Sequence, residues 1–256
     1  MKELQVDLLR VEFGGLKAVN GVTFSTSLDE ISSIIGPNGA GKTTVFNCIT
    51  GTLKQKEGRI TFRGEDISKL KPHVIAGKGI VRTFQKTEVF RELPVLECVK
   101  IGFHRNINTG PMDILTNSNR KKREEKEAVE KAEEILEFVG LQEKKSLVAK
   151  NLAYGEQRLL EIAIALAAKP LLLLLDEPAS GMNPNETEKV MGLIRSMRER
   201  NIGILLIEHD MSLVMGISEK VIVLNQGEII CEGDPRFVCN DKEVIKAYLG
   251  EGFLSA

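Results

Sequence analysis

Short segments rich in apolar residues alternate along the chain with segments of helical periodicity. Four such runs, rich in isoleucine, leucine and valine, span residues 31–35, 171–175, 204–207 and 221–224. Short, mostly apolar segments of this length are typical of strands covered on both faces, as in parallel sheets whose connections are helices. The pattern therefore predicts an α/β fold with a largely parallel sheet.

The N-terminal part of the chain shows short, isolated strands instead. Residues 19–25 and 59–63 have strand-like composition, with Gly21 near the start of the first segment and Gly58 and Gly64 on either side of the second. Glycines at the ends of such segments are typical of turns between neighbouring strands. We therefore expect a small antiparallel β region near the N-terminus.

Strand signals disappear between about residues 95 and 160, and a helical pattern replaces them. One apolar stripe at helical spacing, within residues 120–139, is formed by Val129, Ala132, Ile135, Leu136 and Val139. We expect an inserted helical subdomain, with a surface loop at 106–119. The expected division is 1–94 for the first part of the core, 95–160 for the helical subdomain and 161–256 for the second part of the core.

Charge and cysteine content narrow the class of protein. Lys and Arg total 35 against 36 Asp and Glu, and the basic run at 120–127 alternates with acidic residues, so no nucleic-acid partner is expected. The chain has four scattered cysteines, Cys48, Cys98, Cys231 and Cys239. Their spacing predicts no disulfide or metal site. The apolar stretch at 162–175 is interrupted and too short to span a membrane, which predicts a soluble, cytoplasmic chain.

A phosphate-binding motif follows the first apolar run. The pattern G-x-x-x-x-G-K-[ST] is formed by Gly36, Pro37, Asn38, Gly39, Ala40, Gly41, Lys42 and Thr43, with Thr44 after it. In such loops backbone N–H groups surround the phosphates, the lysine reaches the β and γ phosphates, and the threonine hydroxyl can bind Mg²⁺. A glycine-rich turn without a ligand is the alternative, but strand, loop and helix stand in the order that nucleotide binding requires.

Two adjacent carboxylates end the apolar run at 171–175. Asp176 and Glu177 would lie at the ligand-binding edge of a parallel sheet. Asp176 can then hold Mg²⁺ through water, and Glu177 can polarise the attacking water. Taken alone, such a pair is more often a helix cap, and it is the phosphate loop that favours the functional interpretation.

Residues 152–157, Leu-Ala-Tyr-Gly-Glu-Gln, resemble the signature motif of ABC transporter ATPases, in the form found in branched-chain amino-acid importers. The resemblance covers nearly the whole chain. Phe13 stands at the place of the adenine-stacking aromatic, Gln85 at the Q-loop glutamine, residues 179–183 at the D-loop and His209 at the switch histidine. Each residue alone also fits an ordinary structural role. Their order and spacing favour the family.

The resemblance implies a full set of site residues for ATP and Mg²⁺. Catalysis would involve Glu177, His209, Lys42 and Gln85. Mg²⁺ would be held by Thr43, Gln85 and Asp176. Besides residues 36–44, nucleotide contacts would come from Phe13, Gln85, Asp176, Glu177, His209 and, toward the ATP of an opposite subunit, Ala153, Tyr154, Gly155 and Glu156.

The same resemblance implies the partners. The chain would work as a homodimer, or as a heterodimer with a paralogous ATPase subunit, at the cytoplasmic face of the membrane. It would act on integral-membrane permease subunits and, through them, on a substrate-binding receptor. The segment after Gln85, including Phe90 and Leu93 to Leu96, would receive a short helix of the permease.

Three residues depart from the commoner family pattern. Ala153 lacks the hydroxyl of the usual serine, Tyr154 replaces a glycine, and Ile164 stands where many relatives carry arginine. Phosphate contact would then depend more on backbone groups near Gly155.

Stretches outside the shared motifs, at 14–19, 207–218 and 244–251, resemble importers of leucine, isoleucine and valine. The alternatives are an ATPase for lipopolysaccharide export, a non-transport ABC protein acting on DNA or ribosomes, and a nucleotide-sensing module without enzymatic activity. A single nucleotide domain with no basic excess disfavours the second, and the presence of both Glu177 and His209 disfavours the third.

Overall fold

The computed structural model describes residues 3–83, 91–103 and 119–249. By its internal contacts the chain divides into two compact units, Met1–Arg82 with Leu171–Ala256, and Thr83–Pro170. All strands of the described residues lie in the first unit. The expected functional division at 94/95 and 160/161 stays a prediction.

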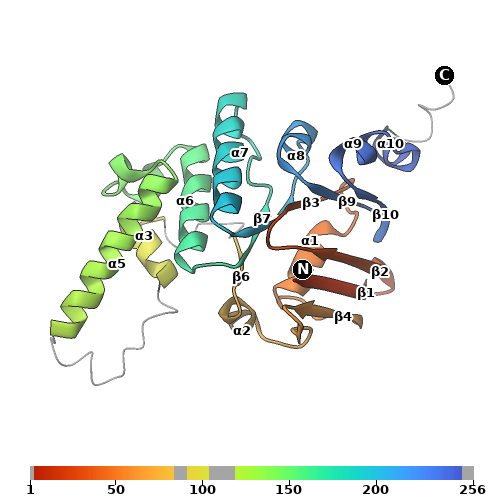
Figure 1. Ribbon diagram of the computed structural model, residues 1–256, viewed down its shortest axis with the longest axis horizontal. Helices are drawn as coiled ribbons and strands as arrows, with labels where there is room; N and C mark the ends of the chain where they lie inside the picture. The colour runs from red at the N-terminus through yellow and green to blue at the C-terminus, as the bar shows by residue number, and fades with distance from the viewer. Residues whose placement is uncertain (1–2, 84–90, 104–118, 250–256) are drawn as a thin grey trace. The chain divides into compact units, whose positions relative to one another are not determined.

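The larger sheet of the first unit has six strands in the order β10-β9-β3-β8-β7-β6 (Figure 1). These are β3 (Ile31–Ile35), β6 (Ile80–Arg82), β7 (Leu172–Asp176), β8 (Gly203–Ile207), β9 (Lys220–Asn225) and β10 (Glu228–Gly233). Neighbouring strands from β6 to β9 run parallel, and β10 pairs antiparallel with β9. Every residue of β3, β7 and β8 is buried. The predicted α/β fold with a largely parallel sheet is confirmed.

A four-stranded antiparallel sheet forms the N-terminal part of the same unit, in the order β2-β1-β4-β5. Its strands are β1 (Leu4–Phe13), β2 (Leu16–Thr26), β4 (Glu57–Phe62) and β5 (Glu65–Asp66). Alternate residues of β2, such as Val22 and Phe24, are buried, as expected for a sheet with one covered face. The predicted antiparallel region is confirmed, although β1 itself was not predicted.

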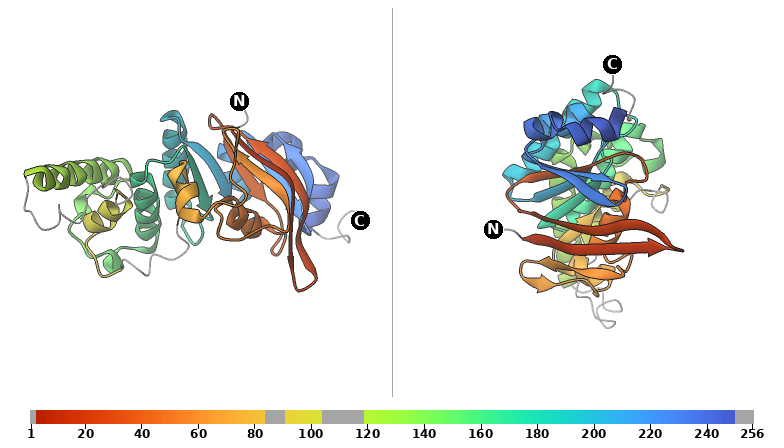
Figure 2. Two further views of the ribbon diagram at one scale, coloured as in Figure 1. Left: turned by 90° about the horizontal axis from the view of Figure 1, so that it is seen from below. Right: turned by 90° about the vertical axis from the view of Figure 1, so that its right-hand side faces the viewer.

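Helices lie on both sides of the six-stranded sheet, and the antiparallel sheet lies on one side with them (Figure 2). Buried apolar residues form a layer on each side. The helices of this unit are α1 (Lys42–Ile49), α2 (Pro72–Gly77), α7 (Pro184–Glu199), α8 (Met211–Ile217), α9 (Pro235–Cys239) and α10 (Lys242–Leu249). Ile34 and Leu224 pack in one layer with α1 and the antiparallel sheet. Ile35 and Val223 pack in the other layer with residues of α8, α9 and α10. Successive side chains of β3 therefore anchor opposite faces, immediately before the phosphate loop.

The second unit is helical. Its elements are α3 (Val95–Gly102), α5 (Asn119–Phe138), η3 (Gln142–Lys144), η4 (Ala149–Asn151) and α6 (Tyr154–Ala167). Ala132 and Leu136 of the predicted stripe are fully buried. Helix α3 packs against α5 and α6, and a Cβ on Gly102 would lie 2.5 Å from the carbonyl oxygen of Ile164. Glycine at this position therefore allows α3 and α6 to approach closely.

The structure also describes the cysteines, the longest apolar helices and part of the region expected as a surface loop. Cys48, Cys98 and Cys231 are buried thiols, and burial raises the pKa of Cys48 to about 12 and that of Cys98 to about 11, which makes both poor nucleophiles. Across residues 3–83, 91–103 and 119–249, no helix has both the length and the apolar content to cross a membrane. Residues 106–118 of the predicted surface loop lie outside the described residues, and Asn119 already belongs to α5.

Candidate nucleotide-binding and catalytic site

The loop between β3 and α1 carries the glycine-rich motif. Gly36, Gly39 and Gly41 have φ angles of 146°, 81° and 103°, which side-chain-bearing residues rarely adopt. A Cβ on Gly36 would lie 2.0 Å from the carbonyl oxygen of Leu224, and one on Gly41 would lie 2.5 Å from that of Ala18. The turn therefore requires glycine both for its backbone angles and for the close approach of β9 and β2.

The lysine of the motif folds back onto its own loop. Lys42 Nζ donates hydrogen bonds to the carbonyl oxygens of Gly36, at 2.7 Å, and Pro37, at 3.0 Å. Its side chain is buried, and burial lowers the pKa of Lys42, while the charges of Glu177 and Asp176 act in the opposite direction. The ammonium group thus lies within electrostatic reach of both carboxylates predicted to serve the same site.

Helix α1 begins at Lys42, directly after Gly41. The first N–H groups of a helix have no partner within it, and the helix dipole adds positive potential there, so this end is suited to an anion. Asn38, Gly39 and Thr43 of the motif are exposed, whereas Ala40 is buried and its carbonyl accepts from the Gly227 amide at 3.0 Å. The loop is therefore fixed to the protein through Ala40, while Asn38, Gly39 and Thr43 remain accessible to a ligand.

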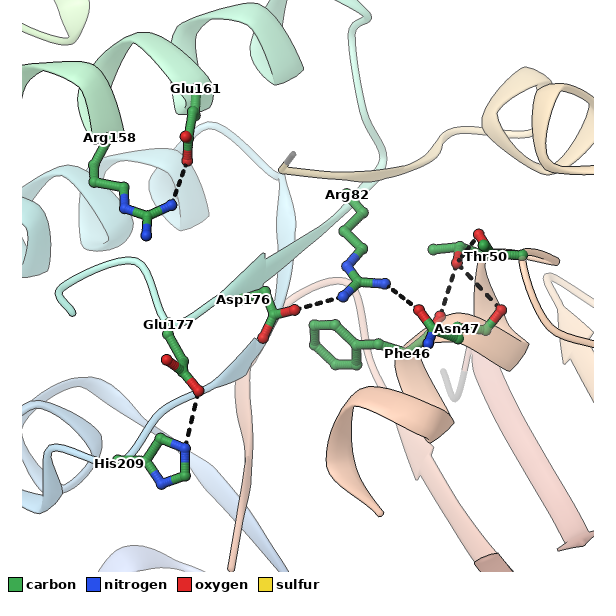
Figure 3. A network of polar contacts seen from close by, with 10 residues as sticks. Phe46, Asn47, Thr50, Arg82, Arg158, Glu161, Asp176, Glu177 and His209 are labelled. Carbon is green, nitrogen blue, oxygen red and sulfur yellow. Dashed lines mark hydrogen bonds and ion pairs between the residues drawn. The ribbon is translucent and has the colours of Figure 1, made fainter. Parts of the chain in front are cut away.

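Strand pairing brings the two predicted catalytic residues together. Asp176 of β7 is in register with Ile207 of β8, so the residues that follow each strand emerge at one edge of the sheet. Glu177 has a left-handed φ of 50°, and its N–H donates to the carbonyl of Ile207 at 2.9 Å. Glu177 Oε1 lies 2.9 Å from His209 Nε2 (Figure 3). Backbone strain of this kind is typical of functional positions.

Glu208 was not predicted as a site residue, but it holds two parts of the site. Its buried carboxylate accepts the N–H of Ala179 at 2.9 Å through Oε1 and the N–H of His209 at 3.0 Å through Oε2. Burial raises the pKa of Glu208, although these backbone hydrogen bonds favour the charged form. The side chain ties the start of the predicted D-loop to the backbone of the predicted switch histidine.

Arg82, at the end of β6, is a second site residue that the sequence did not predict. One of its nitrogens contacts Asp176 Oδ2, another donates to Asn47 Oδ1 at 2.6 Å, and its guanidinium lies over the Phe46 ring, 5.6 Å from the centroid (Figure 3). Phe46 and Asn47 belong to α1, the helix of the phosphate loop. Arg82 therefore connects the carboxylate strand with the phosphate-binding helix.

The residues present fit a Mg²⁺ ion bound together with phosphates. Mg²⁺ takes oxygen ligands and is commonly bound by one or two protein groups plus substrate phosphates. The Thr43 hydroxyl, at the start of α1, and the Asp176 carboxylate, at the end of β7, supply oxygen donors of the kind Mg²⁺ requires. Gln85, the third expected ligand, lies outside the described residues. Among the described residues, no group of three or more His, Cys, Asp or Glu side chains is arranged to hold a metal ion by itself.

Phe13 and the signature residues belong to different units of the chain. Phe13 ends β1 in the first unit and is 49% exposed, so its ring is free for contact. Ala153 precedes α6 in the second unit, and Tyr154, which begins the helix, is exposed. The Tyr154 hydroxyl accepts from Arg158 Nη2 at 2.9 Å, and Arg158 also pairs with the buried Glu161.

The remaining signature residues have roles within their own unit. Glu156 Oε2 accepts the Ala153 N–H at 3.1 Å, and the Glu156 carboxylate also pairs with Lys144. Gly155 is buried. Ile164 is buried on the apolar side of α6, where an arginine would be expensive to desolvate, which gives this departure from the family pattern a physical reason.

Comparison with known proteins gives the same result over the full chain. The family model described as ABC transporter matches residues 19–180, and one described as branched-chain amino acid ATP-binding cassette transporter matches residues 228–253. The chain is 47% identical to the high-affinity branched-chain amino acid transport ATP-binding proteins BraF of Pseudomonas aeruginosa and LivG of Escherichia coli, over 97% of this chain and 98% of each relative.

Solved structures agree with the sequence comparisons. A crystal structure of a nucleotide-free ATP-binding cassette from an ABC transporter matches with a TM-score of 0.86 at 35% identity, over 98% of this chain and all of that one. The ADP conformation of an ABC transporter cassette matches with a TM-score of 0.85 at 33% identity, with the same coverage. The chain belongs to the ABC transporter family, as an ATP-binding protein of its branched-chain amino acid group.

Proposed function

We propose that this chain is the ATP-hydrolysing subunit of a membrane importer for branched-chain amino acids. The observation that carries the catalytic part is the 2.9 Å contact between Glu177 and His209, at the sheet edge next to the phosphate loop. The substrate class is supported by the names of the relatives, which cover nearly the whole chain. No residue of this chain needs to contact the amino acid, because the receptor and permeases would do so.

ATP binds on the loop at residues 36–44, with Phe13 stacked on the adenine. Lys42 leaves the carbonyls of Gly36 and Pro37, to which it is now bonded, and turns to the β and γ phosphates. Thr43, Gln85 and Asp176 would hold Mg²⁺, which would neutralise phosphate charge when bound. Because Lys42 exchanges these carbonyl oxygens for phosphate oxygens, its buried ammonium group has hydrogen-bond acceptors both before and after the change.

Glu177 accepts a proton from the attacking water, whose oxygen bonds to the γ phosphorus as the bond to the β-phosphate oxygen breaks. His209 holds the Glu177 carboxylate in position and contacts the γ phosphate. Glu208 fixes the His209 backbone, so the base and its partner rest on two buried parallel strands. ADP and phosphate are the products.

A second subunit completes each site. Ala153, Tyr154, Gly155 and Glu156 precede or begin α6, a 14-residue helix whose N-terminus suits phosphate oxygens. We assign these residues to the ATP of the opposite subunit, in a homodimer or in a heterodimer with a paralogous ATPase. Alternating closure and opening of this dimer would drive the permeases at the cytoplasmic face of the membrane.

Exposed leucines of the second unit supply a surface for the permease. Leu93 and Leu147 are both exposed, and backbone hydrogen bonds link their segments, because the Ala149 N–H donates to Leu93 O and the Val95 N–H to Leu147 O, each at 2.9 Å. Val95 is core, and Phe90 lies outside the described residues. Leu93→Asp should abolish co-purification with the permeases, whereas Leu16→Asp, at an exposed residue of β2, should not. Equal assembly of both variants would reject this surface.

Reconstitution tests the proposed substrate directly. The chain, its permeases and the receptor are placed in liposomes, and ATP hydrolysis is compared with leucine, isoleucine or valine against lysine and glutamate. The amino acid can stimulate hydrolysis only as far as it favours the closed state of the transporter over the open state. We therefore expect leucine, isoleucine or valine to raise the rate of ATP hydrolysis by about one to two powers of ten. Stimulation by another substrate alone, including a lipopolysaccharide acceptor system, would contradict the importer assignment and leave the ATPase assignment intact.

A further inference from the structure

The turn between β9 and β10, residues 226–227, contacts both the phosphate loop and strand β2. Gly227 of this turn is buried. Its N–H donates to the carbonyl of Ala40 in the loop at 3.0 Å, and its carbonyl accepts from the N–H of Asn20 on β2 at 2.8 Å. The general ABC match ends at residue 180, so it does not include this turn. Both main-chain polar groups of Gly227 therefore join parts of the chain that are distant in sequence.

The strand, the loop and the turn meet backbone to backbone. The carbonyl oxygen of Ala18, on β2, would lie 2.5 Å from a Cβ on Gly41 and 3.0 Å from a Cβ on Gly227. A side chain would collide at the first glycine and fit only tightly at the second. One side-chain bond adds to these contacts, because Asn20 Nδ2 donates to Glu228 Oε1 at 2.6 Å. Direct main-chain contact therefore sets the position of β2 relative to the phosphate loop.

Strand β2 is also paired with the exposed aromatic residue. Leu16, the first residue of β2, is the register partner of Phe13 at the end of β1. Ala18 follows shortly after Leu16, so the partner of Phe13 and the contact with Gly41 lie on one short stretch of β2. Strand β10 lies against β2 as well (Figure 1). A displacement of the turn would therefore move β2, and with it Phe13, relative to the phosphate loop.

We propose that Gly227 is a positioning residue for nucleotide, because its turn sets the spacing between the Phe13 ring and the phosphate loop. The proposal rests on the proposed function, in which ATP contacts Phe13 through adenine and the loop through its phosphates. A ligand held at two points gains most affinity when the spacing of its two sites matches its own length. Gly227 acts on that spacing through Asn20 and Ala40.

Gly227→Ala changes the spacing with a single methyl group. The added Cβ would press on the Ala18 carbonyl and would strain a backbone φ of 82°. We expect this variant to bind ATP, measured at equilibrium with excess Mg²⁺, about three- to tenfold more weakly than wild type, the equivalent of one hydrogen bond.

Gly64→Ala is the matched control for backbone strain. Gly64 lies in the turn between β4 and β5 with the same φ of 82°, and no atom lies within 4 Å of its Cβ position. The substitution therefore strains the backbone equally but presses on no neighbour. Its ATP affinity should stay within about twofold of wild type. Equal losses of affinity in Gly64→Ala and Gly227→Ala would overturn the proposal.

A double-mutant cycle with Phe13→Ala separates spacing from general damage to the loop. In the Phe13→Ala background, Gly227→Ala should weaken ATP binding less than about twofold, because a nucleotide held by the loop alone no longer depends on the spacing. A turn that merely stabilises the loop would give the same loss in both backgrounds. Additive losses would therefore overturn the proposal.

An independent pair of variants tests the turn without altering a glycine. Asn20→Asp places a carboxylate against that of Glu228, so repulsion replaces the hydrogen bond, and ATP binding should weaken about three- to tenfold. Adding Glu228→Gln to Asn20→Asp restores a donor and an acceptor with their roles exchanged. This double variant should recover ATP affinity to within about twofold of wild type. No loss in the first variant, or no recovery in the second, would overturn the proposal.

Failure of the proposed nucleotide contacts would give a different result. A wild-type chain that does not bind ATP, or a Phe13→Ala variant that binds it as tightly as wild type, would reject the contacts themselves. With those contacts intact, unchanged ATP affinity in Gly227→Ala and Asn20→Asp would reject only the positioning role of the turn.

Discussion

Arg82 and Asp176 form a buried ion pair between the ends of two neighbouring parallel strands. Their side chains are only 16% and 3% exposed. Arg82 lies on β6 and Asp176 on β7, and the guanidinium continues to Asn47 on α1. Because Asp176 is a proposed Mg²⁺ ligand, the pair orients a carboxylate of the site and offsets its negative charge.

Removal of the arginine should leave a buried charge without its partner. We expect Arg82→Met to lower the free energy of unfolding by about 3–5 kcal/mol, as for other broken buried pairs. Arg59→Met, which breaks the exposed pair with Asp66, is the control and should cost about 0–1 kcal/mol. Urea unfolding measures both variants. A loss below about 1 kcal/mol for Arg82→Met would mean that the pair does not stabilise the site.

Glu208 should give the chain an unusual dependence of stability on pH. Burial raises its pKa above the ordinary 4.5, so the folded state holds the proton more tightly than the unfolded chain. The contribution of Glu208 is therefore fully present below pH 4.5 and is lost as the pH rises through the folded-state pKa. The difference in unfolding free energy between wild type and Glu208→Gln should fall over this interval.

Glu65 provides the control of opposite sign. Its hydrogen bond with Lys78 lowers the pKa of Glu65, so its contribution is present above pH 4.5 and is lost as the pH falls through the lowered pKa. The difference between wild type and Glu65→Gln should therefore rise with pH. Urea titrations across this interval measure both differences, and parallel pH trends for the two variants would refute the assignment for Glu208.

His209 should act through Glu177 and not only through the phosphate. We expect His209→Ala to reduce kcat about a hundredfold with a small change in ATP affinity, because it removes positioning rather than binding. The double variant with Glu177→Gln should lose little more than Glu177→Gln alone. Asp210→Asn, which keeps a side-chain oxygen for the amides of Ser212 and Leu213, is the neighbouring control. Additive losses in the double variant would show that the two residues act independently.

Much of the fold and site could be predicted because the relevant signals are contiguous. The strand at 31–35, the phosphate loop and Lys42 lie in one segment, and strand, loop and helix follow each other as expected. β7 and β8 have every residue buried, which leaves an unmistakable apolar run. Asp176 and Glu177 follow such a run directly, so their place at the sheet edge could be inferred.

The elements and residues that were missed depend on irregular or distant pairing. The alternation of β1 breaks at Leu8, which is exposed with φ 48°, and β6 has only three residues. Arg82 meets Asp176 across 94 positions of sequence, and Glu208 reaches Ala179 across 29. No local pattern distinguishes such a charged side chain from a solvated one. These contacts arise from the register between neighbouring strands, which cannot be predicted from the sequence of one segment alone.

Glu177, as the group that accepts the proton of the attacking water, is the residue on which the proposed hydrolysis depends most. The decisive measurement is phosphate release from MgATP by wild type and Glu177→Gln, together with the ATP affinity of each. The glutamine variant should bind ATP, accumulate as an ATP-bound dimer and hydrolyse ATP at least about a hundredfold more slowly. Phosphate release near the wild-type rate in Glu177→Gln would contradict the account and remove Glu177 from the catalytic step.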